Sequence, residues 1–275
     1  MHRHIPHLRL LLIAGLVAYT ASANSVECHD LTHREVQFSV CKVDLESDKV
    51  EVFYLDPNGK PFASFTNLVA ELSKINTELL FAMNGGMFDA DLRPLGLLVA
   101  AGSKLKDIRL NGWPKHPPVP PDDVGHFYKI PNAVFSIQSG RAEVADSLTF
   151  YSKKIVPEIA VQSGPMLLQG GMIPAGLRNY NAKGHRRNGV CAPTPTTAAF
   201  VISNQPASIR QLAIFMRDEL KCSDALYLDG CRSALFSKSL RRNDKSCPNS
   251  SGQALPMGSI IGVTSPKLSN RKVGR

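Results

Sequence analysis

Residues 225–236 read Ala-Leu-Tyr-Leu-Asp-Gly-Cys-Arg-Ser-Ala-Leu-Phe, and the interpretation of the whole chain starts from them. Residues 225–228 have strand character and run into Asp229 and Gly230, where the apolar pattern stops and the backbone has to turn. The sequence therefore predicts a carboxylate at the end of a buried strand. The alternative interpretation of the same residues is an ordinary Asp-Gly turn.

A strand and a helix are predicted just before this stretch. Residues 198–203 form an apolar run, and Ser208 and Gln211 have the spacing of a capping box that opens a helix. The apolar face of that helix consists of Ile209, Leu212, Ala213, Met216 and Leu220. Such a strand–helix–strand unit normally connects parallel strands by a crossover, and ligands bind beyond the carboxyl ends of those strands. Asp229 is expected at that edge.

The rest of the chain predicts further strands and a second helix. Alternation over residues 36–55, followed by a turn at residues 56–59, indicates a hairpin or meander. Asn67 is placed to cap a helix with the apolar face Leu68, Leu72, Ile75 and Leu79. Short apolar strands are expected at residues 81–83, 95–100, 133–137 and 158–162. We expect an α+β fold of mixed β-sheets with two principal helices, including one strand–helix–strand crossover.

Two segments are expected to lie outside this framework. Five prolines within residues 113–123 cannot pair in a central strand, and they predict an extended surface loop. The basic tail after Thr264 has no apolar pattern and is expected to be frayed.

The N-terminus has the composition of a secretory signal. Arg3 and Arg9 precede an apolar run at residues 10–18, and Ala21-Ser22-Ala23 supplies a small-x-small cleavage site. The run is about half of the ~20 residues that a membrane-spanning helix needs. We predict a signal peptide at 1–23 and a domain at 24–275. The mature protein is expected to be periplasmic or extracellular, with no transmembrane segment.

The six cysteines indicate disulfides rather than a metal cluster, because export ends in an oxidising compartment. Cys28 and Cys41 could staple the mature N-terminus. The pairing of the other four, Cys191, Cys222, Cys231 and Cys247, stays open. The absence of any Cys-x-x-Cys pair disfavours zinc and thiol-redox interpretations. For Cys231, a structural disulfide is favoured over a thiol nucleophile.

The formal net charge is +9, and removal of the signal takes away Arg3 and Arg9 with no acid, which leaves +7. Excess positive charge favours anionic partners. The sequence has no nucleic-acid recognition motif, so nucleic acid is not expected. Acidic glycans, phosphodiesters or a membrane surface suit an exported protein better. A generally solvated surface charge is the ordinary alternative.

Four turn-rich segments follow apolar strands and carry glycine together with polar side chains. They are Asn84-Gly85-Gly86-Met87-Phe88, Gln162-Ser163-Gly164-Pro165-Met166, Arg186-Arg187-Asn188-Gly189 and Leu228-Asp229-Gly230. Glycines let backbone N–H groups approach a ligand, and Ser, Asn and Arg donate hydrogen bonds to sugar hydroxyls or phosphate oxygens. Together these segments would suit an anionic sugar, although each alone also fits an ordinary turn.

These blocks, with residues 231–236 and Met-Gly-Ser-Ile-Ile-Gly-Val at residues 257–263, resemble the phosphodiester glycosidase domain family in order and rough spacing. That family includes the lysosomal mannose-6-phosphate uncovering enzyme and many exported bacterial proteins. The resemblance covers nearly the whole mature chain. It is greater to the bacterial members, some of which are labelled exopolysaccharide-related.

The resemblance implies a hydrolase that cleaves the glycosidic bond of a sugar-1-phosphodiester. Asp229 would act near the anomeric carbon as nucleophile, base or electrostatic stabiliser, and Arg187 would hold the phosphate. Asn84 would complete the catalytic group, and with Ser163 it would hold hydroxyls or water. The other implied substrate-binding positions are Gly85, Gly86, Gly164, Asn188, Gly230 and Ser233.

The chain also departs from the family pattern. Cys231 and Arg232 stand where the uncovering enzyme has a glycine run, so the substrate stays open. Arg232 could contact the ligand or point to solvent. Asp89 and Asp91 could supply a second carboxylate or a divalent-cation site, but no cofactor or metal is assigned. Two rival functions remain: a non-catalytic glycan- or phosphosugar-binding envelope protein, and a metal phosphodiesterase.

Overall fold

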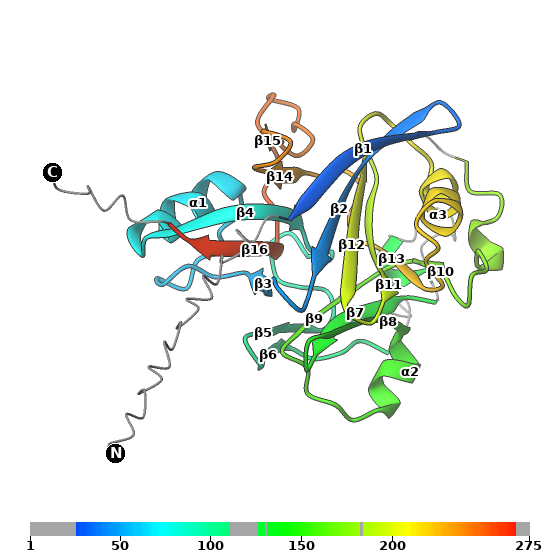
Figure 1. Ribbon diagram of the computed structural model, residues 1–275, viewed down its shortest axis with the longest axis horizontal. Coiled ribbons are helices and arrows are strands. Elements are labelled where there is room, and N and C mark those ends of the chain that lie inside the picture. The colour runs from blue at the N-terminus through cyan, green and yellow to red at the C-terminus, as the bar shows by residue number, and fades with distance from the viewer. Residues whose placement is uncertain (1–25, 111–125, 130, 182–183, 268–275) are drawn as a thin grey trace, which may run out of the picture.

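The computed structural model describes residues 26–110, 126–129, 131–181 and 184–267 (Figure 1). The predicted signal peptide at 1–23, the proline-rich segment at 113–123 and residues 268–275 of the tail lie outside the described residues. The first two predictions are therefore not tested by the structure. Of the tail expected to be frayed after Thr264, residues 265–267 are described and the prediction is wrong for them: Ser265 and Pro266 end β16 (Ile260–Pro266), and the Lys267 N–H donates to the Asn76 carbonyl.

The described strands form three sheets in which every pair of neighbours is antiparallel. The six-stranded sheet has the order β1 (Glu27–His33), β2 (Val36–Asp44), β12 (Thr197–Ser203), β11 (Asn188–Thr194), β13 (Ala225–Tyr227) and β10 (Met166–Leu168). The second sheet has the order β15 (Arg242–Asn243), β14 (Leu235–Ser237), β4 (Thr77–Asn84), β16 (Ile260–Pro266) and β3 (Val50–Phe53). The third has the order β6 (Ser103–Lys106), β5 (Leu98–Ala100), β9 (Ile159–Ser163), β7 (Ala133–Gln138) and β8 (Arg141–Asp146).

One central core joins the three sheets. The rings of Phe81 and Phe135, from two different sheets, lie 4.9 Å and 5.7 Å from the ring of Phe200 in the six-stranded sheet. Alternate residues of a strand face opposite sides, so Phe200 and Ile202 enter this core while Val201 between them joins a separate cluster. The three sheets therefore surround a shared apolar centre.

Each sheet has one α-helix on a face outside that core. Helix α1 (Phe65–Lys74) packs on β4, α2 (Ser147–Ser152) on β7 and β8, and α3 (Ile209–Asp218) on β10, β11 and β13. Two short 3-10 helices, η1 (His126–Tyr128) and η2 (Ala175–Leu177), lie in connections. The α+β class with two principal helices is confirmed, because α1 and α3 have ten residues each and α2 only six.

The predicted crossover is present as β12, α3 and β13. Both strands pair antiparallel with β11, which lies between them, so they run parallel to each other. Ser208 and Gln211 form the complete capping box, and the predicted apolar face of α3 is buried. Asp229 follows β13 by two residues, near the expected strand end.

The prediction for the first helix was wrong at both ends. Helix α1 is capped by Ser64, whose hydroxyl accepts the Asn67 backbone N–H, so Asn67 itself lies inside the helix. The helix ends at Lys74, with Ile75 as its C-cap, because Asn76 adopts a positive φ of 54°. Ile75, which was predicted on the apolar face, is 69% exposed. Leu79 belongs to β4, not to the helix. It was assigned to the apolar face of the helix because it is buried in the same cluster as Leu68 and Leu72.

The hairpin or meander expected over residues 36–55 was also wrong. Strand β2 pairs with β1 and β12, whereas β3 pairs with β16 in another sheet. The alternating pattern indicated half-buried strands correctly, but it carries no information on which strands pair. The turn after them is confirmed, since the Asp56 carboxylate accepts the backbone N–H groups of Asn58 and Lys60.

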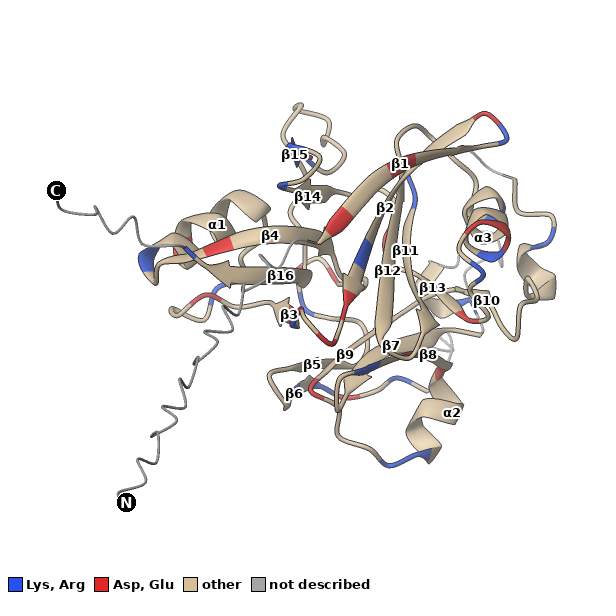
Figure 2. Ribbon diagram, in the orientation of Figure 1, with Lys and Arg blue, Asp and Glu red and all other residues tan. Residues whose placement is uncertain are grey.

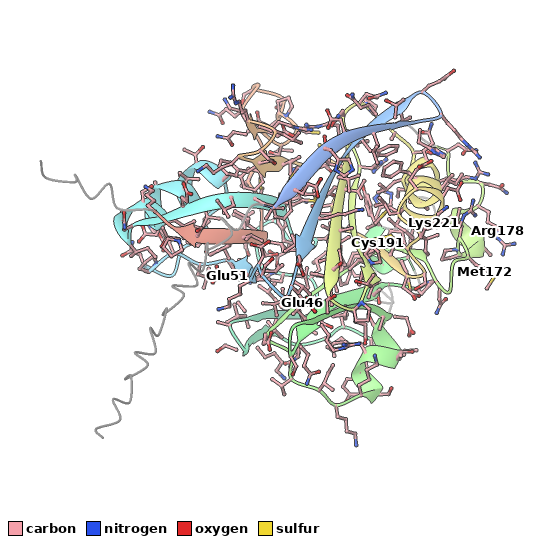
Figure 3. All side chains as sticks on the ribbon, viewed as in Figure 1. Glu46, Glu51, Met172, Arg178, Cys191 and Lys221 are labelled. Carbon is pink, nitrogen blue, oxygen red and sulfur yellow. A yellow bond between two sulfur atoms is a disulfide. The ribbon has the colours of Figure 1, made fainter. Side chains whose placement is uncertain are left out.

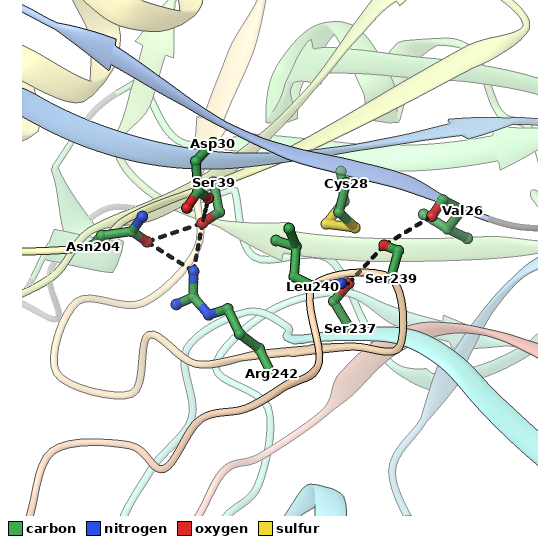
Figure 4. The surroundings of a disulfide bond; sticks show 10 residues. Val26, Cys28, Asp30, Ser39, Asn204, Ser237, Ser239, Leu240 and Arg242 are labelled. Atoms are coloured by element: carbon green, nitrogen blue, oxygen red, sulfur yellow. Dashed lines mark hydrogen bonds between the residues drawn. A yellow bond between two sulfur atoms is a disulfide. The ribbon is translucent and has the colours of Figure 1, made fainter.

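Two disulfides are formed. Cys28–Cys41 joins β1 to β2, as the sequence suggested, and Cys191–Cys222 joins β11 to the segment after α3 (Figure 3). Beside the first disulfide, Arg242 donates to Ser39 and, at 2.8 Å, to Asn204 (Figure 4). Cys231 and Cys247 are not bonded to each other, so the structural disulfide favoured for Cys231 is not formed in this structure.

The surface charge of the described residues is mixed. Basic and acidic ribbon segments are both spread over the molecule in Figure 2, although some strands carry one sign alone, such as β1 with Glu27 and Asp30. No helix in the part of the chain that the structure describes is long and apolar enough to span a bilayer.

Candidate active site

The backbone of the loop that carries Asp229 is held by hydrogen bonds to side chains of neighbouring strands. The Asp229 N–H donates to Oδ1 of Asn188 at 3.1 Å, and the Leu228 carbonyl accepts the Ser163 hydroxyl at 2.6 Å. Ser233 donates from its hydroxyl to the Asp229 carbonyl at 2.5 Å. Strands β9, β11 and β13 therefore converge on this loop.

Asn84 and Asn188 connect the same loop to the second sheet. Nδ2 of Asn188 donates to Oδ1 of Asn84 at 2.8 Å, and that oxygen also accepts the Ala234 N–H at 3.0 Å. Both asparagines are almost fully buried, as is Ser233, whose hydroxyl reaches Oδ1 of Asn188 at 3.0 Å. The four predicted segments thus meet at one place, and these three side chains hold the loop. A catalytic role for Asn84 stays a prediction.

Arg187 is a buried guanidinium beside this loop, 4% exposed. Its Nε donates to the Ala207 carbonyl at 3.1 Å, and Nη1 donates to the Tyr227 hydroxyl at 2.7 Å. A side chain on Gly230 would meet Nη1 at 2.6 Å, so the guanidinium lies directly against the turn after Asp229. Its partners are neutral, which leaves its positive charge available to an anion.

Asp229 has an altered acidity in this setting. Burial raises the pKa of its carboxyl to about 6. The charges of Arg232 and Arg187, and hydrogen bonds from the Arg232 and Gly230 N–H groups, oppose that rise without cancelling it. Asp229 keeps some solvent contact. A carboxyl that titrates near neutral pH beside two guanidinium groups is suited to catalysis.

Arg232 is a second cation at the site that was not among the predicted site residues. Its guanidinium carbon lies 5.4 Å from the centre of the Phe88 ring, and its buried Nε has no hydrogen-bond partner among the described residues. A buried donor without a partner is costly and suits a bound acceptor. The departure from the family pattern had marked this position, with ligand contact and exposure to solvent both left open.

His126 was missed by sequence reasoning altogether. Its ring lies edge-on to Tyr227, with centroids 5.6 Å apart, and its Nε2 lies 3.0 Å from the Tyr180 hydroxyl. Burial, followed by the positive charge of Arg187, lowers the pKa of His126 to about 4, so the ring is neutral at pH 7. No local motif marks this histidine, because tertiary folding alone brings it next to β13.

The glycines of the site have a packing reason. A Cβ on Gly85 would lie 2.3 Å from Oγ of Ser259, one on Gly86 would lie 2.5 Å from the Gln162 carbonyl oxygen, and one on Gly164 would lie 2.9 Å from Cβ of Asn132. Gly230 is equally confined, with the Tyr227 hydroxyl 2.3 Å away. Close approach between the converging loops therefore explains these glycines, and their contact with a substrate stays a prediction.

Two other groups of acids make no described contact with Asp229. The carboxylate of Asp89 accepts the N–H groups of Asp91 and Arg93, and Asp91 pairs with Arg93 at 3.1 Å, so both acids serve an exposed turn. A cavity of about 430 Å³ is lined by Asp48, Glu51 and Glu158 together with apolar residues of β3 and β9. None of its lining residues belongs to the loops around Asp229.

Comparisons with known proteins agree with the arrangement of the fold. The catalytic domain of zebrafish N-acetylglucosamine-1-phosphodiester alpha-N-acetylglucosaminidase, auto-inhibited by its pro-peptide, superposes with a TM-score of 0.58 and 17% identity, covering 89% of this chain and 85% of that one. A hypothetical protein from Synechocystis gives a TM-score of 0.50 and 13% identity, covering 86% and 61% of the two chains. At these identities the likeness shows the fold alone.

Sequence comparison reaches further. The uncharacterized protein YigE of Escherichia coli K12 is 27% identical over 196 residues, which is 71% of this chain and 72% of that protein. The profile of the phosphodiester glycosidase family matches residues 77–264, a span that contains every predicted site residue. By that match, the chain belongs to the phosphodiester glycosidase family.

Proposed function

We propose that this protein is an exported hydrolase that cleaves the glycosidic bond of a sugar-1-phosphodiester on a cell-envelope or environmental glycoconjugate. The observation that carries the proposal is the position of one carboxyl, Asp229, beside two guanidinium groups, Arg187 and Arg232. Family membership supports the reaction class. The two disulfides support export, since such bonds persist in oxidising compartments.

The reaction breaks the bond between the anomeric carbon and the bridging phosphate oxygen. Water supplies the new sugar hydroxyl, and the aglycone departs with its phosphomonoester. The transition state places positive charge on the sugar ring, which the Asp229 carboxylate stabilises by charge or by covalent attack. Phosphate leaves as an anion, so the cations beside it favour departure.

Arg187 is assigned the phosphate. A guanidinium has five N–H donors, and the described contacts use only Nε and one of the Nη1 hydrogens. The remaining donors form a fork that matches two phosphate oxygens. Arg232, with its unpaired Nε, is assigned to the same phosphate or to the adjoining sugar hydroxyl.

The test uses purified mature protein, a panel of sugar-1-phosphodiesters and water enriched in oxygen-18. Cleavage of the glycosidic bond puts the label in the released sugar, whereas cleavage of the phosphate ester puts it in the phosphate. We expect label in the sugar only. The matching glycoside without phosphate is the control substrate, and it should turn over at least about 100-fold more slowly, because it lacks the group that the arginines hold.

Asp229→Asn is the matched variant. It keeps the side-chain shape but cannot act as nucleophile or base, so kcat should fall by about three orders of magnitude or more with binding retained. Binding without turnover in both proteins would favour the glycan-binding alternative. Label in the phosphate together with inactivation by chelator would favour the metal phosphodiesterase.

A further inference from the structure

Three side chains with sulfur or imidazole atoms gather at the rim of the candidate site. The Sγ atoms of Cys231 and Cys247 and a ring nitrogen of His185 all lie within 4.8 Å of one another. Nδ1 of His185 is 3.9 Å from Sγ of Cys247. Cys231 follows Asp229 by two residues and His185 precedes Arg187 by two, so the cluster adjoins both candidate catalytic segments.

The backbones of the two cysteines are directly joined by a hydrogen bond. The Cys247 N–H donates to the Cys231 carbonyl at 2.9 Å. The two Sγ atoms lie within 4.8 Å of each other, so the backbones and the sulfurs of the pair are both adjacent. Disulfides join residues whose Cα atoms are about 4.4 to 6.8 Å apart, and this adjacency favours a bond between the two cysteines.

The surroundings of this pair differ from those of the buried disulfide. Cys191 and Cys222 are almost fully buried, whereas Cys231 and Cys247 are both partly exposed and His185 is exposed. Thiol exchange requires access of the attacking reagent to sulfur. The rim pair is therefore open to small thiols and disulfides that cannot reach Cys191.

We propose that Cys231 and Cys247 form an exchangeable third disulfide that anchors the loop carrying Asp229. The oxidant is a disulfide compound in the compartment to which the protein is exported, either a small molecule such as oxidised glutathione or a protein disulfide.

The exchange balances in two steps. His185 takes the proton of Cys247, whose thiolate attacks one sulfur of the oxidant and forms a mixed disulfide, releasing the first thiolate. The Cys231 thiolate then attacks the Cys247 sulfur and releases the second. Two electrons pass from the protein sulfurs to the oxidant, and both protein protons end on the released thiols. Burial raises the pKa of Cys231 to about 12, so Cys247, which lies beside His185, is the first to react.

The crosslink would close the segment between residues 231 and 247. That segment contains β14 and β15, and it is otherwise held by contacts such as the 2.9 Å ion pair of Arg186 with Asp244. Closing such a loop removes conformations from the unfolded chain. It also restrains Cys231 and Arg232, and with them the turn that presents the Asp229 carboxyl.

The test needs no substrate, so its outcome is independent of the proposed glycosidase activity. Mature protein is equilibrated with oxidised glutathione, quenched with an alkylating reagent, and examined by intact mass and non-reducing peptide mapping. We expect a 231–247 crosslinked peptide and no alkylated cysteine. Mild reduction should open this link while Cys191–Cys222 stays intact, and should lower Tm by about 5 °C.

Two variants separate the proposal from a simple loss of folding. Cys231→Ser and Cys247→Ser should each leave one reactive thiol and melt at the temperature of the reduced parent. His185→Gln should slow formation of the link without changing its final extent. Two thiols that stay free in excess oxidised glutathione would overturn the proposal. So would one tightly bound Zn²⁺ per chain that is lost in both cysteine variants, since the cluster would then be a metal site.

Discussion

Asn188 donates from Nδ2 to Oδ1 of Asn84 at 2.8 Å, and this bond joins the start of β11 in one sheet to the end of β4 in another. The same Asn188 accepts the Asp229 N–H through Oδ1. The Asn188 side chain therefore links the loop that carries Asp229 to both sheets. Asn84 and Asn188, which were predicted to act on the substrate, hold this loop in position in the structure.

Replacement of Asn188 gives the first prediction. Asn188→Ala leaves Oδ1 of Asn84 with one partner fewer and the Asp229 N–H with none, in a buried setting. The free energy of unfolding should fall by about 2–3 kcal/mol, measured by urea denaturation. Asn58→Ala, in the exposed turn of Asp56, is the control and should change it by less than about 0.5 kcal/mol. Equal losses in the two variants would show that the hydrogen bonds of Asn188 stabilise the fold no more than a residue of an exposed turn does.

A second prediction concerns Arg187. Arg187→Lys keeps the positive charge but loses the Nε bond to Ala207 and the fork that fits two phosphate oxygens. We expect kcat/KM on a sugar-1-phosphodiester to fall about 100-fold, or roughly 3 kcal/mol of transition-state stabilisation. Arg178→Lys, on the exposed periphery (Figure 3), is the matched control and should retain the activity of the parent. Retained activity in Arg187→Lys would remove the phosphate assignment.

The raised pKa of Asp229 sets the pH profile. The carboxylate is required as nucleophile, base or stabiliser, and it predominates above pH 6 because burial raises the pKa of Asp229 to about 6. The kcat/KM should therefore rise tenfold per pH unit below that value and level off above it. The profile is measured between pH 4 and 8, with substrate and protein stability checked at each point. A midpoint near pH 4 would mean that the carboxyl is not desolvated in the free enzyme.

The same shift predicts how stability depends on pH. An unfolded Asp titrates near 3.9, so between pH 4 and 6 the folded chain holds a proton that the unfolded chain releases. Stability is therefore lost as the pH rises through this window, and the loss is complete above pH 6. Asp229→Asn has no carboxyl that can ionise. Its free energy of unfolding should therefore exceed that of the parent by about 2 kcal/mol at pH 8 and equal it at pH 4. Calorimetry at the two pH values checks this, and a variant less stable than the parent at pH 8 would contradict it.

Sequence patterns predicted the parts of the fold that local chemistry determines. Spacing within short stretches of sequence was enough to predict the capping box of Ser208 and Gln211, the buried face of α3 and the strand before Asp229. Strand partners do not, since β2 and β3 have similar patterns but enter different sheets. His126 was missed for the same reason: its place beside Tyr227 depends on contacts far apart in sequence.

Gly230 shows why the site needed coordinates as well as motifs. Sequence reasoning assigned this glycine to ligand access, whereas in the structure its missing side chain makes room for the Tyr227 hydroxyl and Nη1 of Arg187. A methyl group there would lie 2.3 Å from the first and 2.6 Å from the second, so one or both must shift. Because the Arg187 side chain is the more adaptable of the two, its guanidinium is expected to move away from the turn.

Gly230→Ala should therefore lower kcat/KM by about tenfold to 100-fold and the free energy of unfolding by about 1–3 kcal/mol. Gly176→Ala is the matched control, because a Cβ at that position meets nothing within 4 Å and the backbone needs no positive φ. Activity is assayed on the same phosphodiester, and a crystal structure of the variant would report the guanidinium position. If Gly230→Ala kept full activity with Arg187 displaced, the guanidinium would have no part in the reaction, and the phosphate would have to be held by Arg232.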